Sequence, residues 1–376
     1  MAGRLRQMRL WPALLALAGC SSASTFPCST DAQCVSGAST GSCLKSSVSL
    51  TKWCAFPSAS CSGAGPGLRW DATAGDDLAG TCVSAASVPD GGVASVVLEE
   101  CTALSSTITG LWGLDANTFY AVSKAGGICR RDASGWRSEV AEGMTTTLTS
   151  VTGSPAGAIV YAAGSEVFYS DGTGGWTGIQ TLPRTAMFYG VAACGEADFY
   201  LVGSDVGTAP NTTVGVIYQG ATDMWTLVGP KTGQPTSYFA AWCAHFPIAV
   251  GAQGALATTG ALNGWSQYSS ATGIDLHAVS GTPDMDSSYV AGGPGVVTQG
   301  MLARFVATPL PKQVVNGLYQ FSPTDIYAAA SDVLHYDGTR WNVIPTNAAV
   351  PFSSVWGAGH DVFVGGDNGT IVHLTR

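Results

Sequence analysis

The chain has 376 residues, 46% of them hydrophobic and only 11% charged, and it carries a net charge of −9. So large an apolar share excludes an intrinsically disordered protein, and so few lysines and arginines exclude a nucleic-acid partner, which requires a basic surface. The 49 glycines are typical of a fold with many tight turns rather than of long helices.

Residues 1–19 have the features of an export signal. Arg4, Arg6 and Arg9 give it a positive start, and the apolar run at residues 10–18 is too short to remain in a membrane as a spanning helix. The cysteine count agrees with export. Without Cys20, ten of the 11 cysteines remain, an even number as expected for disulfides in an oxidising compartment.

The end of this signal, Leu17-Ala18-Gly19-Cys20, resembles the lipobox of bacterial lipoproteins. The resemblance implies that the chain is cleaved before Cys20 and that Cys20 is acylated, which anchors the protein to a membrane. Ser21 follows the acylated position, and the lack of an aspartate there implies sorting to the outer membrane of the cell envelope. The alternative is an ordinary signal peptide, with Cys20 left as a spare thiol.

Residues 20–27 hold the lipidated cysteine and a tether, and residues 28–87 are predicted to form a small disulfide-rich module. The module has few aliphatic residues, so three disulfides must replace a large core, each stabilising it by roughly 2–4 kcal/mol. About fifteen pairings are open. Its spacing loosely resembles Cys-rich modules of lipoproteins from predatory bacteria and Dickkopf-type motifs. The six cysteines are Cys28, Cys34, Cys43, Cys54, Cys61 and Cys82.

After a linker at residues 88–92, a pattern recurs seven times at intervals of 37 to 50 residues. Each copy contains an apolar first strand, a β-branched or aromatic second strand, a third strand ending in a turn, and usually a Trp that opens the fourth. Such repeats predict an all-β fold, a seven-bladed β-propeller over residues 93–376. The first strands are marked by Leu111, Val151, Val191, Ala241, Val279, Leu318 and Val355.

The last repeat ends after its third strand, and the missing strand is predicted from the other end of the propeller. Residues 92–99 precede the first repeat and have the composition of a strand. An N-terminal strand that completes the last blade pairs both exposed edges and closes the ring. An open β-solenoid or two sandwiches are the alternatives.

Two predicted turns, Ser170–Trp176 and Tyr336–Trp341, resemble degenerate Asp-boxes of sialidase-type propellers, and the repeats resemble WD40-like propellers of predatory soil bacteria. In an Asp-box the aspartate caps the turn, the glycine takes a positive φ and the Trp packs between blades, away from any active site. The third-strand turns are predicted at 132–135, 170–172, 219–220, 260 and 337–338.

Four aromatic residues share one position of the first strand, nearest the axis: Trp112, Trp242, Tyr319 and Trp356. A ring of aromatics there could stack sugars, but packing between blades is the preferred interpretation. No catalytic residue, metal or cofactor is predicted. Metal binding between His245 and His360, or calcium binding at Asp284–Asp286 or Asp367–Gly369, is a weaker interpretation than isolated histidines and turns.

Two disulfides are predicted in the propeller. Cys194 and Cys243 end equivalent strands of neighbouring blades, which places them close together, and by elimination Cys101 pairs with Cys129. The second bond would tie the ring closure covalently.

These features predict an exported outer-membrane lipoprotein whose propeller is a non-catalytic binding platform for a protein or glycan. The alternative is a secreted carbohydrate-active enzyme, a hydrolase or lyase, on the same fold. The sequence alone does not decide whether it is an enzyme, although the lack of recurring arginines disfavours a sialidase.

Overall fold

The computed structural model describes residues 26–28, 33–36, 39–45, 52–58, 61, 68–74, 78–83, 93, 95–140, 146–172, 175–207, 209, 212–229, 235–243, 246–259, 264–282, 289–301, 304–346 and 348–376. By contacts, the chain divides into two compact units, Met1–Pro89 and Asp90–Arg376. The predicted signal, the lipobox with Cys20 and the linker at residues 88–92 lie outside the described residues.

The first unit contains two small antiparallel sheets and three disulfides. Leu44, Trp53 and Trp70 pack in a small apolar core. The disulfides join Cys28 to Cys43, Cys34 to Cys54, and Cys61 to Cys82. The sheets are formed by β1 (Val35–Ser36) with β2 (Ser39–Thr40), and by β3 (Ser42–Lys45), β4 (Lys52–Pro57) and β5 (Leu68–Trp70).

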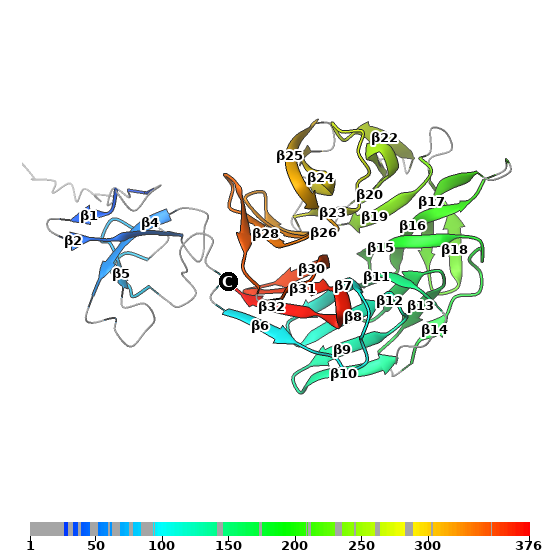
Figure 1. Cartoon of the computed structure of the whole chain (residues 1–376), viewed down its shortest axis with the longest axis horizontal. Coiled ribbons are helices and arrows are strands. Elements are labelled where there is room, and N and C mark those ends of the chain that lie inside the picture. Colours follow the sequence, from blue (N-terminus) through cyan, green and yellow to red (C-terminus); the bar gives the residue numbers. More distant parts are fainter. Residues whose placement is uncertain are drawn as a thin grey trace, which may run out of the picture. The chain divides into compact units, whose positions relative to one another are not determined.

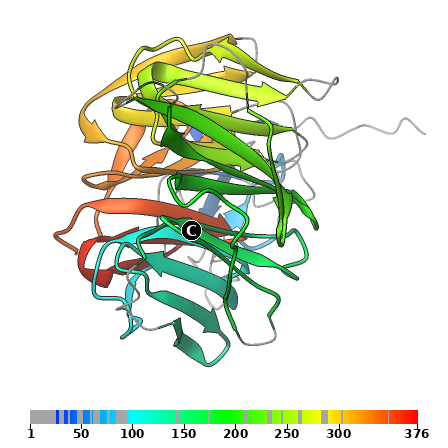
Figure 2. The ribbon, with the colours of Figure 1, turned by 90° about the vertical axis from the view of Figure 1, so that its right-hand side faces the viewer.

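The second unit is a seven-bladed β-propeller (Figures 1 and 2). Blade 1 consists of β7 (Ile108–Asp115), β8 (Thr118–Ser123), β9 (Ile128–Asp132) and β10 (Gly135–Val140). Blade 2 consists of β11 (Leu148–Gly153), β12 (Val160–Gly164), β13 (Val167–Ser170) and β14 (Thr177–Gly178). Blade 3 consists of β15 (Met187–Gly195), β16 (Asp198–Val206), β17 (Thr213–Ala221) and β18 (Met224–Leu227). In each blade the first strand lies innermost (Figure 1).

The remaining four blades complete the ring. Blades 4 and 5 are β19 (Tyr238–Cys243), β20 (Pro247–Gly251), a 3₁₀ turn (Ala252–Gly254), β21 (Ala255–Thr259) and β22 (Trp265–Ser269); and β23 (Ala278–Gly281), β24 (Tyr289–Met301) and β25 (Arg304–Val314). Blades 6 and 7 are β26 (Gly317–Ser322), β27 (Asp325–Ala329), β28 (Val333–Tyr336) and β29 (Trp341–Ile344); and β30 (Phe352–Ala358), β31 (Asp361–Gly366), a 3₁₀ turn (Asp367–Gly369), β32 (Ile371–Thr375) and β6 (Ser95–Glu99).

The ring closes through β6, as the sequence predicts. This strand pairs antiparallel with β32, with Glu99 opposite Ile371 and Ser95 opposite Thr375. In Figure 1 the cyan β6 lies alongside the red β32. A disulfide joins Cys101, which follows β6, to Cys129 in blade 1. Closure therefore combines a strand ladder with a covalent bond.

The Trp of the fourth strand packs against the preceding blade, which explains why it recurs. The indoles of Trp176, Trp225 and Trp265 meet the rings of Tyr120, Tyr161 and Tyr200 edge-on, at centroid distances of 6.2, 5.6 and 5.9 Å. These pairs and the apolar first strands form one core between each pair of neighbouring blades.

The Asp-box-like turn between β28 and β29 has the predicted geometry. Asp337 accepts hydrogen bonds from the backbone N–H of Thr339 and Arg340, at 2.8 and 2.9 Å, and Gly338 has φ of 90°. Burial opposes ionisation, but these bonds and one from Asn342 hold the pKa of Asp337 well below its ordinary value. The turn is structural.

Two details differ from the sequence prediction. The blade 3 turn does not lie at residues 219–220, which are inside β17, but at Thr222 with φ of 49°, where the N–H bonds the Tyr161 hydroxyl. The prediction relied on glycines to mark turns, and it missed this turn because a threonine takes the strained, positive-φ position. In blade 5, β24 pairs with β23 through its first half and with β25 through its second, so three strand elements stand where four were expected.

Among the described residues, no helix is long and apolar enough to cross a membrane.

Candidate functional site

The first strands of all seven blades line the axis, and their two ends carry different chemistry. Because neighbouring strands are antiparallel, the first strands all start at one end of the ring, together with the turns between second and third strands. We call this the starting end, and the other the far end. Positions along these strands are counted from Ile108 in blade 1, so that Trp112 is at the fifth position.

An axial cavity of about 450 Å³ opens toward the far end. Every blade contributes to its lining through the fourth to sixth positions of its first strand. This volume lies within the range of roughly 300–1,000 Å³ usual for small-ligand sites. None of the described residues that line it is an aspartate, glutamate, arginine, lysine or histidine. The described part of the lining is uncharged, although the chain as a whole is acidic.

The four predicted aromatic residues do line this cavity, but they are not equivalent. Trp356 is only 7% exposed and packs against Phe119 and Phe363 in the core between blades 7 and 1. Trp112 and Trp242 are half-buried. Trp112 nevertheless packs against the core between blades 1 and 2, and Trp242 packs against the core between blades 4 and 5. Packing between blades, the interpretation preferred from the sequence, therefore holds for all three tryptophans.

Trp112 and Trp242 each lie flat on a glycine of the next blade. A Cβ built on Gly153 would stand 2.2, 2.5 and 2.6 Å from Cη2, Cζ3 and Cζ2 of Trp112, and one on Gly281 would stand 2.7 Å from both Cη2 and Cζ3 of Trp242. These near-equal distances mean that each ring faces its glycine, because an edge-on approach would leave the atoms beside Cη2 much farther away. One face of each indole is therefore covered by the glycine of the next blade.

A sequence signal for these contacts exists between blades. Where the first strand of one blade has an aromatic residue at its fifth position, the first strand of the next blade has a glycine at its sixth position. Examples are Trp112 with Gly153 and Trp242 with Gly281. The blades that follow a smaller fifth residue have another residue there: Ala193 after Thr152, Cys243 after Ala192, and Gln320 after Ser280. Reading each repeat by itself does not show this pattern.

Hydroxyl groups lie between the aromatic rings. The half-buried Thr152 hydroxyl has no hydrogen-bond partner among the residues that the structure describes. Burial raises the pKa of Tyr319, so its phenol keeps its proton at neutral pH. Beside Trp242, the disulfide between Cys194 and Cys243 links blades 3 and 4. The described lining of the far end therefore combines aromatic rings, hydroxyl groups and a disulfide that links two blades.

At the starting end, the second position of the first strand usually joins neighbouring blades. The Thr109 hydroxyl donates to the Leu148 carbonyl at 2.9 Å, and the Thr149 hydroxyl donates to the Phe188 carbonyl at 2.7 Å. Asn316 and Ser353 make the equivalent bonds to the carbonyls of Phe352 and Ile108. Each of these residues donates to the first position of the next blade.

Blades 3, 4 and 5 replace this bond with an aromatic arc, formed by Tyr189, Phe239 and His277. The Tyr189 and Phe239 rings meet at 5.6 Å and 68°, and the Phe239 and His277 rings meet at 5.2 Å and 82°. All three side chains are half-buried. Aromatic side chains at the starting end were not predicted from the sequence.

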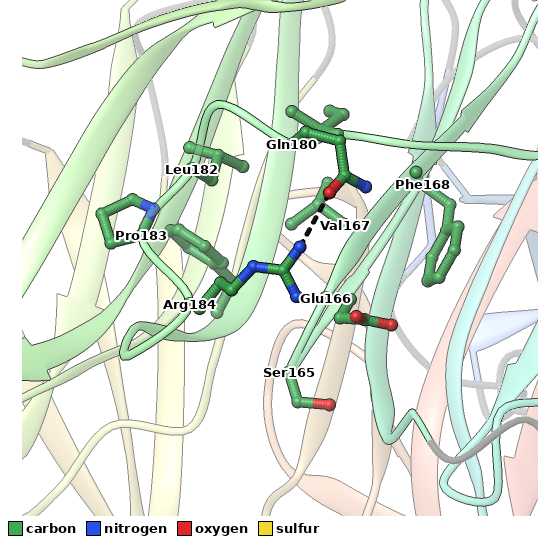
Figure 3. A pocket seen from close by; sticks show the side chains of 11 residues that line it. Ser165, Glu166, Val167, Phe168, Gln180, Leu182, Pro183 and Arg184 are labelled. Carbon is green, nitrogen blue, oxygen red and sulfur yellow. Dashed lines mark hydrogen bonds between the residues drawn. The ribbon is translucent and has the colours of Figure 1, made fainter.

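A second pocket lies between blades 2 and 3 at the starting end (Figure 3). Its lining includes Glu166 and Arg184, and the Arg184 guanidinium donates to the Gln180 side-chain oxygen at 2.9 Å. The pocket holds only about 60 Å³, which is room for water but not for an organic ligand.

Only some of the histidines and acidic turns named in the sequence lie among the described residues. His245 and Asp284–Asp286 lie outside the described residues, and His360 is exposed in the turn after β30. Asp367 accepts a hydrogen bond from the Thr107 hydroxyl at 2.7 Å. The sulfurs of Cys28, Cys34 and Cys54 lie within 4.8 Å of one another, but all three are in disulfides and cannot act as thiolates.

The densest cluster of ionisable groups holds the ring closed. Glu99 accepts hydrogen bonds from Arg131 at 2.8 Å and from the Trp136 indole at 2.6 Å, both in blade 1. His373 lies 2.9 Å from Glu99 through Nδ1 and 2.7 Å from Asp361 through Nε2. This cluster joins β6 to two strands of blade 1, β9 and β10, and to β31 and β32 of blade 7, and none of its residues lines the axial cavity.

Comparison with known proteins supports the fold. No family model and no curated protein matches the chain. Among solved structures, YCF48 bound to a D1 peptide is 15% identical, with a TM-score of 0.54 over 75% of this chain and 97% of that one. YCF48 from Cyanidioschyzon merolae is 14% identical, with a TM-score of 0.58 over 75% and 98%. The WD40 β-propeller domain of Doa1 is 10% identical, with a TM-score of 0.59 over 74% and 95%. The chain is similar to these proteins as a β-propeller.

Proposed function

We propose that the propeller is a non-catalytic platform that binds a protein partner at its starting end. The aromatic arc carries the proposal. In four blades the second position donates a bond between blades, and in three consecutive blades that bond is absent where Tyr189, Phe239 and His277 stand in a row.

The energetics explain why such a replacement is tolerated. A hydrogen bond contributes about 0.5–1.5 kcal/mol, and an aromatic pair contributes about the same. The arc therefore changes stability little, while it places partly exposed aromatic rings at the opening of the ring. Half-exposed aromatic residues are typical anchors of protein interfaces. Ile274, 42% exposed, lies at the same end in the connection between blades 4 and 5.

Similar structures support a protein partner. One of them is described as YCF48 bound to a D1 peptide, and another is a WD40 propeller. Because the likeness shows the fold alone, the partner of this chain is argued from the arc.

An enzyme on the same fold is less well supported. Hydrolysis of a glycosidic bond usually needs two carboxylates that flank it, and no carboxylate of the described residues lines the axial cavity. The main carboxylate cluster, around Glu99, is occupied with ring closure.

We further propose that the protein is a lipoprotein of the outer membrane, anchored through Cys20. The export signal and the lipobox support this proposal. Labelled palmitate should enter the full chain and not a Cys20→Ala variant, and that variant should leave the membrane fraction. Unchanged membrane retention of the Cys20→Ala variant would refute the anchor.

The proposed protein-binding platform is tested by replacing residues of the aromatic arc with the residue that other blades have at the same position. Tyr189→Thr and Phe239→Thr place at the second position the residue that blades 1 and 2 use there, so the fold keeps a donor for the next blade. Crosslinking of the full chain in isolated envelopes should yield the same partner repeatedly, and either variant should lose it. Met224→Ala, a change at a 78% exposed residue of β18, is the control that should keep it. Equal capture by all of these proteins would contradict the proposal.

A further inference from the structure

The disulfide between Cys194 and Cys243 differs in exposure from the other four that the structure describes. Both of its cysteines are half-buried. Each of the other four bonds contains at least one cysteine that is no more than 9% exposed, and Cys129, in the bond that ties the ring closure, is fully buried. Thiol–disulfide exchange requires a thiolate to reach one of the two sulfurs, so access selects the bond that reacts. Among the five described disulfides, the bond between blades 3 and 4 is therefore the most open to exchange.

The axial cavity gives a route to one end of this bond. Cys243, at the sixth position of its first strand, lines the cavity, whereas Cys194 does not. Cys194 packs instead against the core between blades 3 and 4, which contains Tyr200 and Tyr238. A thiol that enters from the far end therefore meets Cys243 first. The cavity volume of about 450 Å³ admits a small organic thiol and excludes a folded protein.

The strand ladders are irregular at both cysteines. Cys194 lies in a bulge, where the pairing of β15 with β16 shifts between Ala193 and Gly195. Cys243 stands opposite Pro247, which has no N–H to donate to β19. When the disulfide opens, the two strand ends can therefore separate without breaking a regular run of hydrogen bonds.

Blades 3 and 4 keep other contacts after the disulfide opens. A Cβ built on Gly190 would stand 3.0 Å from the Cα of Ala240, so the two first strands approach closely along the axis. The rings of Tyr189 and Phe239 meet at the starting end. Closure of the ring depends on a separate disulfide and on the cluster around Glu99. Exchange at the far end should therefore leave the propeller assembled.

We propose that the Cys194–Cys243 disulfide is an exchange site for a low-molecular-weight thiol that enters the axial cavity. The thiolate attacks the sulfur of Cys243, the bond to Cys194 breaks, and Cys194 leaves as a thiolate that takes a proton from solvent. Cys243 then carries the small thiol as a mixed disulfide. A second thiolate attacks the sulfur of the bound thiol and releases Cys243, so two small thiols become one small disulfide while the protein bond gains two electrons.

The first experiment follows reduction of the full chain by glutathione. Free thiols are blocked with N-ethylmaleimide at intervals, and the labelled peptides are measured by mass spectrometry. The Cys194–Cys243 bond should be reduced about tenfold or more faster than the Cys101–Cys129 bond. The same thiol attached to a large dextran should be about tenfold slower at the first bond, because the carrier cannot enter the cavity. Equal rates at the two bonds, or equal rates for free and dextran-bound thiol, would overturn the proposal.

Two matched variants separate the two sulfurs. Cys194→Ser leaves Cys243 as a free thiol on the cavity, and Cys243→Ser leaves Cys194 against the core between blades 3 and 4. With glutathione disulfide, the first variant should acquire one glutathione about tenfold faster than the second. Both variants lack the same cross-link, so a general loosening would affect them alike, and equal uptake would contradict the route through the cavity. Partner crosslinking by both variants should be unchanged, which separates this test from that of the platform.

Discussion

The two ends of the axis are built from the same seven strands and differ in what interrupts the repeat. At the starting end, three consecutive blades replace a polar bond with the aromatic arc. At the far end, two aromatic residues on opposite sides are each matched by a glycine one blade later. In both places the departure from the repeat is a relation between neighbouring blades. A repeat fold can therefore carry specific sites without losing its repeat.

Glu99→Ala should have the largest effect, because it removes support from both ends together. It leaves Arg131, Trp136 and His373 without their shared partner, and loss of one member of a partly buried charge pair costs about 2–4 kcal/mol. Urea unfolding of the propeller should show this loss. Glu100→Ala, the neighbouring exposed carboxylate, is the control, and equal midpoints for the two variants would mean that closure depends on the strand ladder alone.

Gly281→Val should damage the far end and leave the starting end intact. The added side chain has no room beneath Trp242, so overpacking should destabilise the protein by about 1–3 kcal/mol and tilt the indole. Denaturant unfolding and near-ultraviolet circular dichroism measure the two consequences. Gly264→Val, at a glycine where a Cβ would meet nothing within 4 Å, should be nearly neutral. A neutral Gly281→Val variant would show that the indole is free to move.

Much of the fold could be predicted from the sequence because its signals are local and repeated. The seven first strands, the closing strand and the packing of Trp176, Trp225 and Trp265 follow from patterns within one repeat. The turn at Thr222 could not be predicted in the same way, because a non-glycine residue takes a positive φ there, held by a hydrogen bond from its N–H to Tyr161 in another blade.

The candidate sites were harder to predict because their signals cross blade boundaries. The four aromatic residues nearest the axis were identified from their shared position. Trp112 and Trp242 each face a glycine of the next blade, whereas Trp356 packs against Phe119 and Phe363. The sequence does not show this difference, because Gly113 stands at the same position of the blade that follows Trp356. The signal for the aromatic arc also crosses blade boundaries. Tyr189, Phe239 and His277 stand out only when their blades are compared with those whose second position donates a hydrogen bond to a carbonyl of the next blade.

The pH dependence of closure distinguishes general loss of the ring from loss at one end. Burial disfavours the charged form of His373, but hydrogen bonds to Glu99 and Asp361 raise the pKa of this residue above 6.5. The stabilisation from His373 is therefore complete below pH 6.5 and falls as the pH rises through the raised pKa. Burial also opposes ionisation of Glu99, but bonds from His373, Arg131 and Trp136 lower its pKa from 4.5 to about 2, so its stabilisation is complete above 4.5 and is lost as the pH falls toward 2.

Closure should therefore be strongest between about pH 4.5 and 6.5. Urea midpoints measured across pH 3–9 should show this maximum, and His373→Gln should remove the alkaline decline while leaving the acid one. A decline of the same size in His373→Gln would assign it to another group.

Tyr189→Thr should have the smallest effect on stability and the most selective effect on function. The new hydroxyl can donate to the Tyr238 carbonyl, the first position of the next blade, as Thr149 does to Phe188. This gained bond offsets the lost contact with Phe239, so the free energy of unfolding should change by no more than about 0.5 kcal/mol. Partner crosslinking should nevertheless fall. A variant that keeps the partner, or that unfolds more easily by a wide margin, would show that the arc is a structural part of the ring and that the contrast between its two ends is wrong.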